Sequence, residues 1–149
     1  MNKAVILVGV SGSGKSTFAS REYPSAVTVS ADHYFMVDGE YRFDVSKLGE
    51  AHGACLRAFV EAAISGVGRI VVDNTNTTLV ELAPYISLAK AYGYGVEVVR
   101  VRCPVEVAAA RNTHGVGEGA IRAMDARITA MMEAGLPPFW GVVVREVGA

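Results

Sequence analysis

Short apolar runs alternate with longer stretches of helical period along the 149-residue chain. An apolar run of about four to eight residues bounded by turn residues is typical of a strand buried on both faces. Five such runs predict strands at residues 4–8, 26–30, 69–73, 96–102 and 142–146. Strands that alternate with helices favour an α/β fold, in which helices flank a mostly parallel sheet.

The stretches between these runs carry apolar residues every three or four positions, as a helix with one buried face does. They predict helices over residues 15–22, from Leu48 to near Gly66, from Thr78 to Gly93, over residues 105–111, and along the stripe of Ile121, Met124, Ile128 and Met131 that Gly135 ends. Thr78 and Glu81 have the spacing of a capping box. Pro84 lies inside that helix, so the pattern predicts either a kink or a later start.

A glycine-rich segment joins the first predicted strand to the first predicted helix. It reads Gly-Val-Ser-Gly-Ser-Gly-Lys-Ser-Thr and matches the pattern of a phosphate-binding loop. Such a loop turns successive backbone N–H groups toward phosphate oxygens, and the following helix adds its positive end. The residues predicted to bind nucleotide here are Gly9, Ser11, Gly12, Ser13, Gly14, Lys15, Ser16 and Thr17.

Two of these side chains have more specific expected roles. Lys15 is expected to bridge the β- and γ-phosphates, and the Ser16 hydroxyl is expected to bind a metal ion. The loop therefore predicts ATP and Mg²⁺ as the ligands of this protein.

Polar residues follow the second and third predicted strands, at the edge of the sheet where ligands of open α/β sheets bind. Asp32 is expected to accept the proton of an attacking hydroxyl, with a helix N-cap as its alternative role. Asp73 follows an apolar strand and is expected to orient the metal ion or the acceptor. Asn74 and Asn76 are either site residues or turn formers.

Arg111 ends the short fourth helix, where its planar guanidinium suits a pair of phosphoryl oxygens. A surface arginine is the alternative. Four aromatic residues flank a polar turn further upstream, namely Tyr34, Phe35, Tyr41 and Phe43. They are expected either to stack on a ring of the substrate or to pack in the hydrophobic core.

These motifs together resemble a known family. The set is the glycine-rich loop, Ser-Ala-Asp-His-Tyr, Asp-Asn-Thr-Asn, Ala-Lys-Ala-Tyr-Gly-Tyr and Arg-Asn-Thr-His-Gly-Val. It resembles the kinase domain of phage polynucleotide 5′-hydroxyl kinase. It is more similar still to the AAA-type ATP-binding domains of some animal proteins that bind ubiquitin ligases. The resemblance spans roughly residues 4–128.

The resemblance implies roles for matching positions. It implies that Lys15 and Ser16 bind ATP and Mg²⁺, that Asp32 is the general base, and that Asp73 and Thr75 face the acceptor. Arg111 would contact the donor phosphates.

The resemblance also implies an arginine-bearing lid, here over about residues 112–135. His114 stands where the phage enzyme has a further arginine. Arg122 or Arg127 would then join Arg111 in meeting the charge of the transition state and in binding the nucleotide.

Composition narrows the classes of partner. Lys and Arg number 14 against 15 Asp and Glu, giving a net charge of −1 and a pI near 6.3, which excludes a non-specific duplex binder but allows contact with a nucleic-acid end. The two cysteines lack zinc-binding spacing, which favours reduced thiols in a cytoplasmic protein without zinc. No apolar stretch reaches the roughly 18 to 20 residues that cross a bilayer, so no membrane partner is expected.

The sequence thus predicts one P-loop kinase domain over residues 1–149 that moves the γ-phosphoryl group of ATP to a hydroxyl. The acceptor that the sequence and the resemblance favour is the 5′-hydroxyl end of a polynucleotide. A small-molecule kinase acting on a nucleoside, sugar or antibiotic hydroxyl is one alternative. A nucleotide-dependent binding module without transfer activity is the other.

Overall fold

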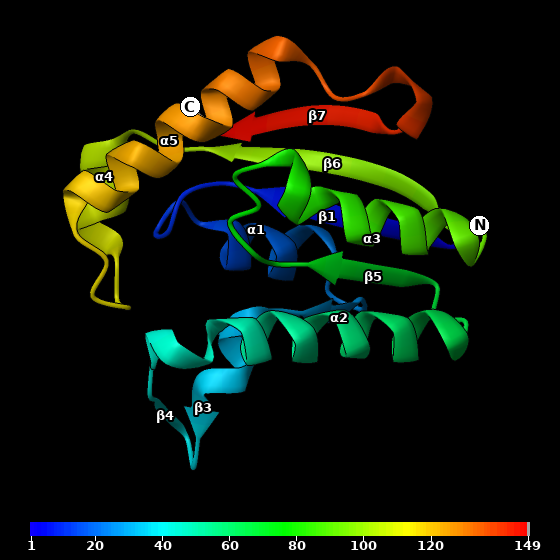
Figure 1. Cartoon of the computed structure of the whole chain (residues 1–149), viewed down its shortest axis with the longest axis horizontal. Coiled ribbons are helices and arrows are strands. Elements are labelled where there is room, and N and C mark those ends of the chain that lie inside the picture. The colour runs from blue at the N-terminus through cyan, green and yellow to red at the C-terminus, as the bar shows by residue number, and fades with distance from the viewer. Residues whose placement is uncertain (149) are drawn as a thin grey trace.

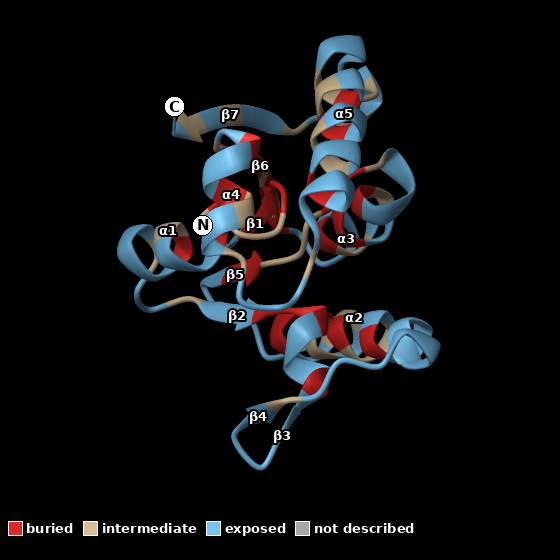
Figure 2. Cartoon of the chain, turned by 90° about the vertical axis from the view of Figure 1, so that its left-hand side faces the viewer, coloured by how far each residue is buried: buried red, intermediate tan, exposed pale blue. Residues whose placement is uncertain are grey.

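A computed structural model describes residues 1–148 and shows a five-stranded sheet in which every strand pairing is parallel. The strands lie in the order β2 (Val27–Val29), β5 (Arg69–Val72), β1 (Lys3–Val8), β6 (Gly95–Arg102) and β7 (Val143–Gly148), which can be followed in Figure 2. In the register, Lys3 of β1 lies opposite Arg69 of β5 and Gly95 of β6. The predicted α/β class and its five strands are confirmed.

Helices follow the strands as the periodicity predicts. They are α1 (Lys15–Glu22), α2 (Leu48–Ile64), α3 (Leu79–Ala91), α4 (Val105–Arg111) and α5 (Glu118–Ala134). Three short 3-10 helices also form, namely η1 (Ala31–Phe35), η2 (Val45–Lys47) and η3 (Pro138–Trp140). The apolar spacing therefore located every long helix.

Residues after η1 form a small hairpin that the hydrophobic pattern does not predict. Its strands β3 (Met36–Val37) and β4 (Glu40–Tyr41) are antiparallel and project away from the main sheet (Figures 1 and 2). Strands of two residues are too short to show a period. The turn residues Asp38 and Gly39 both have positive φ, and an Asp-Gly pair is the sequence signal for such a hairpin.

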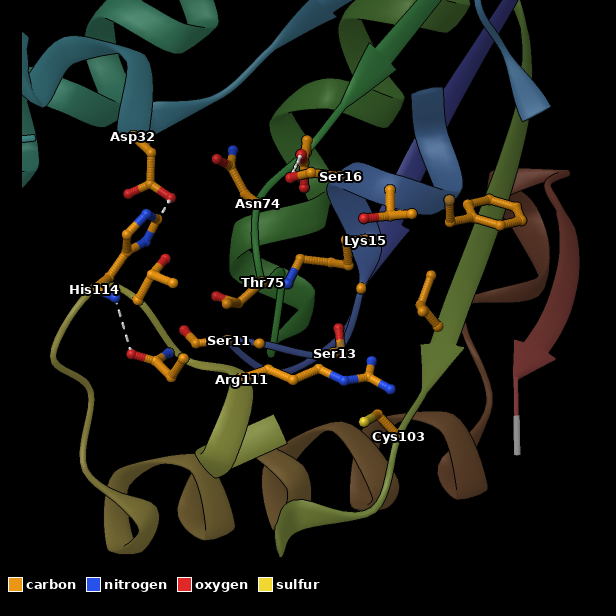
Figure 3. Close-up of a pocket in the computed structure, with 18 of the residues that line it drawn as sticks. Ser11, Ser13, Lys15, Ser16, Asp32, Asn74, Thr75, Cys103, Arg111 and His114 are labelled. Atoms are coloured by element: carbon orange, nitrogen blue, oxygen red, sulfur yellow. Dashed lines mark hydrogen bonds and ion pairs between the residues drawn. The ribbon is translucent and has the colours of Figure 1, made fainter. Parts of the chain in front are cut away.

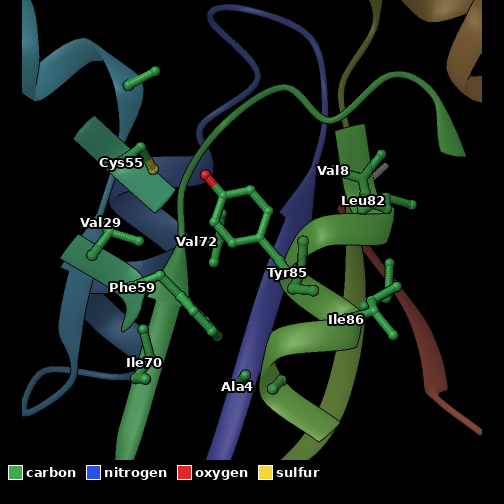
Figure 4. Packing of buried hydrophobic residues seen from close by; sticks show 14 of the residues in the cluster. Ala4, Val8, Val29, Cys55, Phe59, Ile70, Val72, Leu82, Tyr85 and Ile86 are labelled. Atoms are coloured by element: carbon green, nitrogen blue, oxygen red, sulfur yellow. The ribbon is translucent and has the colours of Figure 1, made fainter. Parts of the chain in front are cut away.

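The core lies on both faces of the sheet, with β1 at its centre. Ala4, Ile6 and Val8 enter the larger apolar cluster, which helices α2, α3 and α5 cover. Val5 and Leu7 enter a smaller cluster beneath α1. Figure 4 shows part of the larger cluster, where the rings of Phe59 from α2 and Tyr85 from α3 meet edge to face at 5.4 Å. This layered packing holds the carboxyl ends of the strands in place around the glycine-rich loop.

Helix α3 begins where the capping box predicts. The Thr78 hydroxyl accepts a hydrogen bond from the backbone N–H of Glu81 at 3.4 Å, and the Glu81 carboxylate accepts one from the N–H of Thr77 at 2.7 Å. Pro84 lies within the helix and does not delay its start, which is at Leu79.

The region predicted as a lid, residues 112–135, is divided in the structure. Residues 112–117 form a loop, while α5 buries Ile121, Ile128 and Met131 in the larger apolar cluster. Most of this region is therefore a helix that packs one face on the core, and only its loop borders the cleft described below. Across residues 1–148, none of the helices has the length and apolar character needed to cross a membrane.

Candidate functional site

The glycine-rich loop connects β1 to α1 and curls tightly. Gly12 and Gly14 have φ values of 80° and 96°, a backbone conformation that favours glycine. A Cβ atom at Gly12 would lie 2.2 Å from the carbonyl oxygen of Ala108, so the loop packs directly against α4. The loop therefore has the shape that its sequence pattern predicts.

Lys15 begins α1 and is buried with its ammonium group beneath the loop. Its Nζ donates hydrogen bonds to the carbonyl oxygens of Gly9 at 3.0 Å and Val10 at 2.9 Å. Burial lowers the pKa of Lys15, while the negative charges of Asp73 and Asp32 act in the opposite direction. An ammonium group has three donors, so one remains for a phosphate oxygen.

Ser16 and Asp73 meet across the loop. The Ser16 hydroxyl donates to the Asp73 carboxylate at 2.6 Å. A serine hydroxyl next to the carboxylate that follows a buried strand is the oxygen donor set that holds Mg²⁺ in P-loop proteins. The two side chains expected to bind the metal ion therefore lie together and fit that ion.

Ser13 provides a second sign that the loop suits an anion. Its hydroxyl oxygen is buried, and it makes no hydrogen bond within the described part of the chain. A buried polar group normally has a partner, and phosphate oxygens would supply one at this position.

Asp32 lies in η1, directly after β2. The Ser30 hydroxyl caps η1 by accepting a hydrogen bond from the backbone N–H of Asp32 at 3.2 Å, so the Asp32 side chain is not the cap. That side chain is 52% exposed and faces the cleft. A substrate can therefore reach its carboxylate.

Two neighbours hold the Asp32 carboxylate, and sequence reasoning missed both contacts. The Tyr41 hydroxyl donates to Oδ1 at 3.1 Å, and Nδ1 of His114 lies 3.6 Å from Oδ2. Burial, followed by the charge and hydrogen bond of Asp32, raises the pKa of Tyr41 to about 12, so this hydroxyl remains a donor at neutral pH. A carboxylate has about four lone-pair sites, which leaves room for a substrate hydroxyl.

His114 reaches Asp32 because its loop is folded against the hairpin. Its ring stacks on the Tyr41 ring, with centroids 4.2 Å apart and planes inclined by 14°. The Asn112 side chain fixes the loop by accepting from the N–H groups of His114 at 3.1 Å and Val116 at 2.9 Å. An asparagine just after a helix favours such a turn, and this was the available sequence signal.

The segment after β5 has mainly structural contacts. Asn74 accepts from the N–H of Ala31 at 2.9 Å, and the Asn76 amide donates to the carbonyl of Leu7 at 2.7 Å. Asn76 thus behaves as a loop former, whereas Asn74 supports η1 and also lines the cleft. Thr75 accepts from the N–H of Gly9 through its backbone at 3.1 Å and also lines the cleft.

The structure separates the three candidate arginines. Arg111 lines the cleft, and one of its terminal nitrogens would lie 3.6 Å from a Cβ atom on Gly14. Arg122 is instead paired with Glu106 at 3.6 Å and Glu118 at 3.4 Å. Arg127 donates to the Thr77 hydroxyl at 3.4 Å. Neither Arg122 nor Arg127 lines the cleft, because both lie on α5, which is packed on the core.

All remaining predicted site residues except Gly9 line one open cleft of about 1190 Å³. Gly9 lies beneath the loop, against Val101 and Lys15. Figure 3 shows Asp32 and His114 at one end, the guanidinium of Arg111 and Cys103 at the other, and Lys15 and Ser16 between them. This volume exceeds that of ordinary ligand pockets, which is about 300 to 1,000 Å³, so the cleft has room for a nucleotide and a second molecule.

The parallel sheet, the glycine-rich loop ahead of α1 and the paired Ser16 and Asp73 define a P-loop protein with a kinase-like fold. A family model described as an AAA domain matches residues 5–137. This chain therefore belongs to that family of AAA domains, and the family expected from the motifs is confirmed.

Known proteins agree with this assignment. NEDD4-binding protein 2 of Homo sapiens is 38% identical over 128 residues, which cover 80% of this chain and 7% of that protein. This chain thus corresponds to a small part of that relative.

Two solved structures share the fold. One is the Pnkp1/Rnl/Hen1 complex, with a TM-score of 0.61 and 24% identity over 77% of this chain and 40% of the other. The second is the Mycobacterium tuberculosis APS kinase CysC in complex with AMPPNP and APS, with a TM-score of 0.57 and 21% identity over 83% and 75% of the two chains.

Proposed function

We propose that this protein is an ATP-dependent phosphotransferase that moves the γ-phosphoryl group of ATP to a hydroxyl. The observation that carries this proposal is the cleft in which a phosphate-binding loop and an accessible carboxylate, that of Asp32, occupy separate positions. The kinase-like fold supports it.

The donor would lie along the glycine-rich loop. Backbone N–H groups of the loop and the free N–H of Lys15 would bind phosphate oxygens, and Arg111 would bind them from the side of α4. Ser16 and Asp73 would hold Mg²⁺. When bound, this ion neutralises charge on the β- and γ-phosphates.

Asp32 would act on the acceptor. Its carboxylate takes the hydroxyl proton while the hydroxyl oxygen forms a bond to the γ-phosphorus and the bond to the bridging oxygen of ADP breaks. Tyr41 and His114 hold the two carboxylate oxygens and so fix the direction of the remaining lone pairs. A positioned base of this kind contributes roughly 10² to 10⁴ in rate.

The proposed acceptor group is a hydroxyl. The 5′-hydroxyl end of a polynucleotide and the hydroxyl of a small molecule both satisfy the chemistry of Asp32.

The unpaired cysteines Cys55 and Cys103 agree with the cytoplasmic location proposed from the sequence.

The test is the variant Asp32→Asn, compared with Asp38→Asn in the exposed turn of the hairpin. We expect Asp32→Asn to lower kcat by about 10² or more while leaving the affinity for an ATP analogue unchanged, because asparagine cannot accept the proton. Asp38→Asn should keep the full rate, since asparagine tolerates the positive φ of 51° at that position. ADP release and analogue binding are the measurements.

Two results would contradict the proposal. A rate in Asp32→Asn above one tenth of the original would show that Asp32 is not the base. Tight ATP binding without ADP release, across a panel of nucleosides, sugars, amino sugars and 5′-hydroxyl oligonucleotides, would favour the binding module instead.

A further inference from the structure

The positive charges of the cleft are gathered at its donor end. Its lysine and arginine residues are Lys15, Arg21, Arg102 and Arg111. They come from α1, the end of β6 and the end of α4. Glu22 of α1 lines the same end, and Arg102 is paired with Glu146 at 3.5 Å, so Lys15 and Arg111 are the cations next to the glycine-rich loop. In Figure 3 the guanidinium of Arg111 points away from Asp32, toward the side of Cys103.

The acceptor end has a different composition. It is built by η1, the β3–β4 hairpin, the segment after β5 and the loop of residues 112–117. These elements contribute Ser30, Asp32, His33, Met36, Tyr41, Asp73, Asn74, Thr75, Asn112, Thr113 and His114 to the lining. Within residues 1–148, this lining includes two carboxylates and no lysine or arginine.

Asp73 is the carboxylate proposed to hold Mg²⁺ with Ser16, so Asp32 is the one whose charge acts on the acceptor, and no nearby arginine among the described residues offsets it. Arg42 of the hairpin is paired with Glu40 at 3.1 Å and does not line the cleft. His114 is cationic only when protonated, and its Nδ1 already faces Asp32. A phosphate next to the reacting hydroxyl would therefore meet negative charge without the arginine or lysine that normally binds it.

We propose that the acceptor is a small neutral or cationic alcohol, such as a nucleoside or an amino sugar, with no phosphate close to its reacting hydroxyl. This inference rests on the phosphotransferase function proposed above. It disfavours a polynucleotide end, because the first nucleotide of such an end has a phosphate on the same sugar as the reacting 5′-hydroxyl. Polynucleotide affinity comes largely from lysines and arginines that bind these phosphates, and the described residues that line the acceptor end include neither.

Matched acceptors test the proposal directly. Adenosine and adenosine 3′-monophosphate present the same 5′-hydroxyl and differ by one phosphate group. We expect kcat/KM for adenosine to exceed that for the monophosphate, and that for a 5′-hydroxyl oligonucleotide, by about tenfold or more, a preference of about 1.4 kcal/mol. A neutral sugar and a cationic amino sugar form a second comparison, read by the same ADP release. Equal or higher kcat/KM for the phosphorylated acceptors would overturn the inference and leave the phosphotransferase function intact.

A charge added to the acceptor end provides the reverse test. Thr113 is exposed on the loop of residues 112–117 and lines the cleft, so Thr113→Arg places a cation beside the acceptor. This variant should reduce the preference for adenosine over its 3′-monophosphate by about tenfold. The control Ala120→Arg lies at an exposed position of α5 that does not line the cleft. It should leave the preference for adenosine over its 3′-monophosphate unchanged. An unaltered preference in Thr113→Arg would contradict the electrostatic reason.

A binding measurement tests the proposed acceptor class without requiring phosphoryl transfer. In the presence of AMPPNP and Mg²⁺ at 150 mM salt, we expect a fluorescent 5′-hydroxyl oligonucleotide to bind more weakly than about 100 µM, the weak limit of non-specific binding. Saturable binding at low micromolar concentration would overturn the inference. Failure of every acceptor to release ADP would instead contradict the proposed function, so the two failures are distinguishable.

Discussion

At the scale of the residue, the glycine-rich loop depends on the close approach of Gly12 to α4. In Gly12→Ala the new Cβ would lie 2.2 Å from the Ala108 carbonyl oxygen, so the loop must move and its N–H groups lose their common direction. We expect the affinity for an ATP analogue to fall by about 100-fold or more. This corresponds to a loss of about 2.8 kcal/mol of binding free energy, because each 1.4 kcal/mol changes the affinity tenfold. Isothermal titration calorimetry measures this.

The matched control is Gly39→Ala in the hairpin turn. Gly39 has a φ of 81°, close to that of Gly12, but no atom lies within 4 Å of the added Cβ. This variant should lose about 1 kcal/mol of unfolding free energy to backbone strain and keep its nucleotide affinity. Equal affinities in the two variants would show that contact with α4 does not shape the loop.

At the scale of the element, the start of α3 depends on the hydroxyl of Thr78. Removing it in Thr78→Ala leaves the N–H of Glu81 without its side-chain acceptor, which should lower the unfolding free energy by about 1 kcal/mol. Thr78→Ser keeps the hydroxyl and should remain within a few tenths of a kcal/mol of the original. Urea denaturation measures the unfolding free energy of the original protein and of the two variants. An equal loss of unfolding free energy in Thr78→Ala and Thr78→Ser would assign the effect to the methyl group, which both variants lack.

At the scale of the whole molecule, the proposed donor site joins segments that are distant in the chain, so nucleotide binding should stabilise the complete fold. Mg·ATP at 100 times its Kd should add about 2.7 kcal/mol, and the melting temperature should rise by roughly 5 to 11 °C for a chain of this size. Adding EDTA should reduce the increase if Ser16 and Asp73 hold the metal ion. The variant Lys15→Met should show little increase, and an increase as large as that of the original protein would contradict the role of Lys15.

The amino-acid sequence by itself determined the layered α/β fold and the family of this protein. Both depend on local patterns. Apolar runs such as residues 4–8 mark buried strands, three-to-four spacing marks helices, and the glycine-rich loop needs only its own residues and the flanking strand and helix to be recognised. The cap of α3 at Thr78 belongs to the same group, because capping bonds lie within four residues of one another.

Only the tertiary structure decided which distant side chains meet. The contacts of Asp32 with Tyr41 and His114 span 9 and 82 positions, and no periodic pattern encodes a pair at such separations. The same holds for the arginines: Arg111 reaches the cleft while Arg122 pairs with glutamates outside it, although both fall in regions where the sequence allowed a phosphate contact. The direction of a side chain depends on how its helix packs on the core, and that packing is settled by the whole chain folding together.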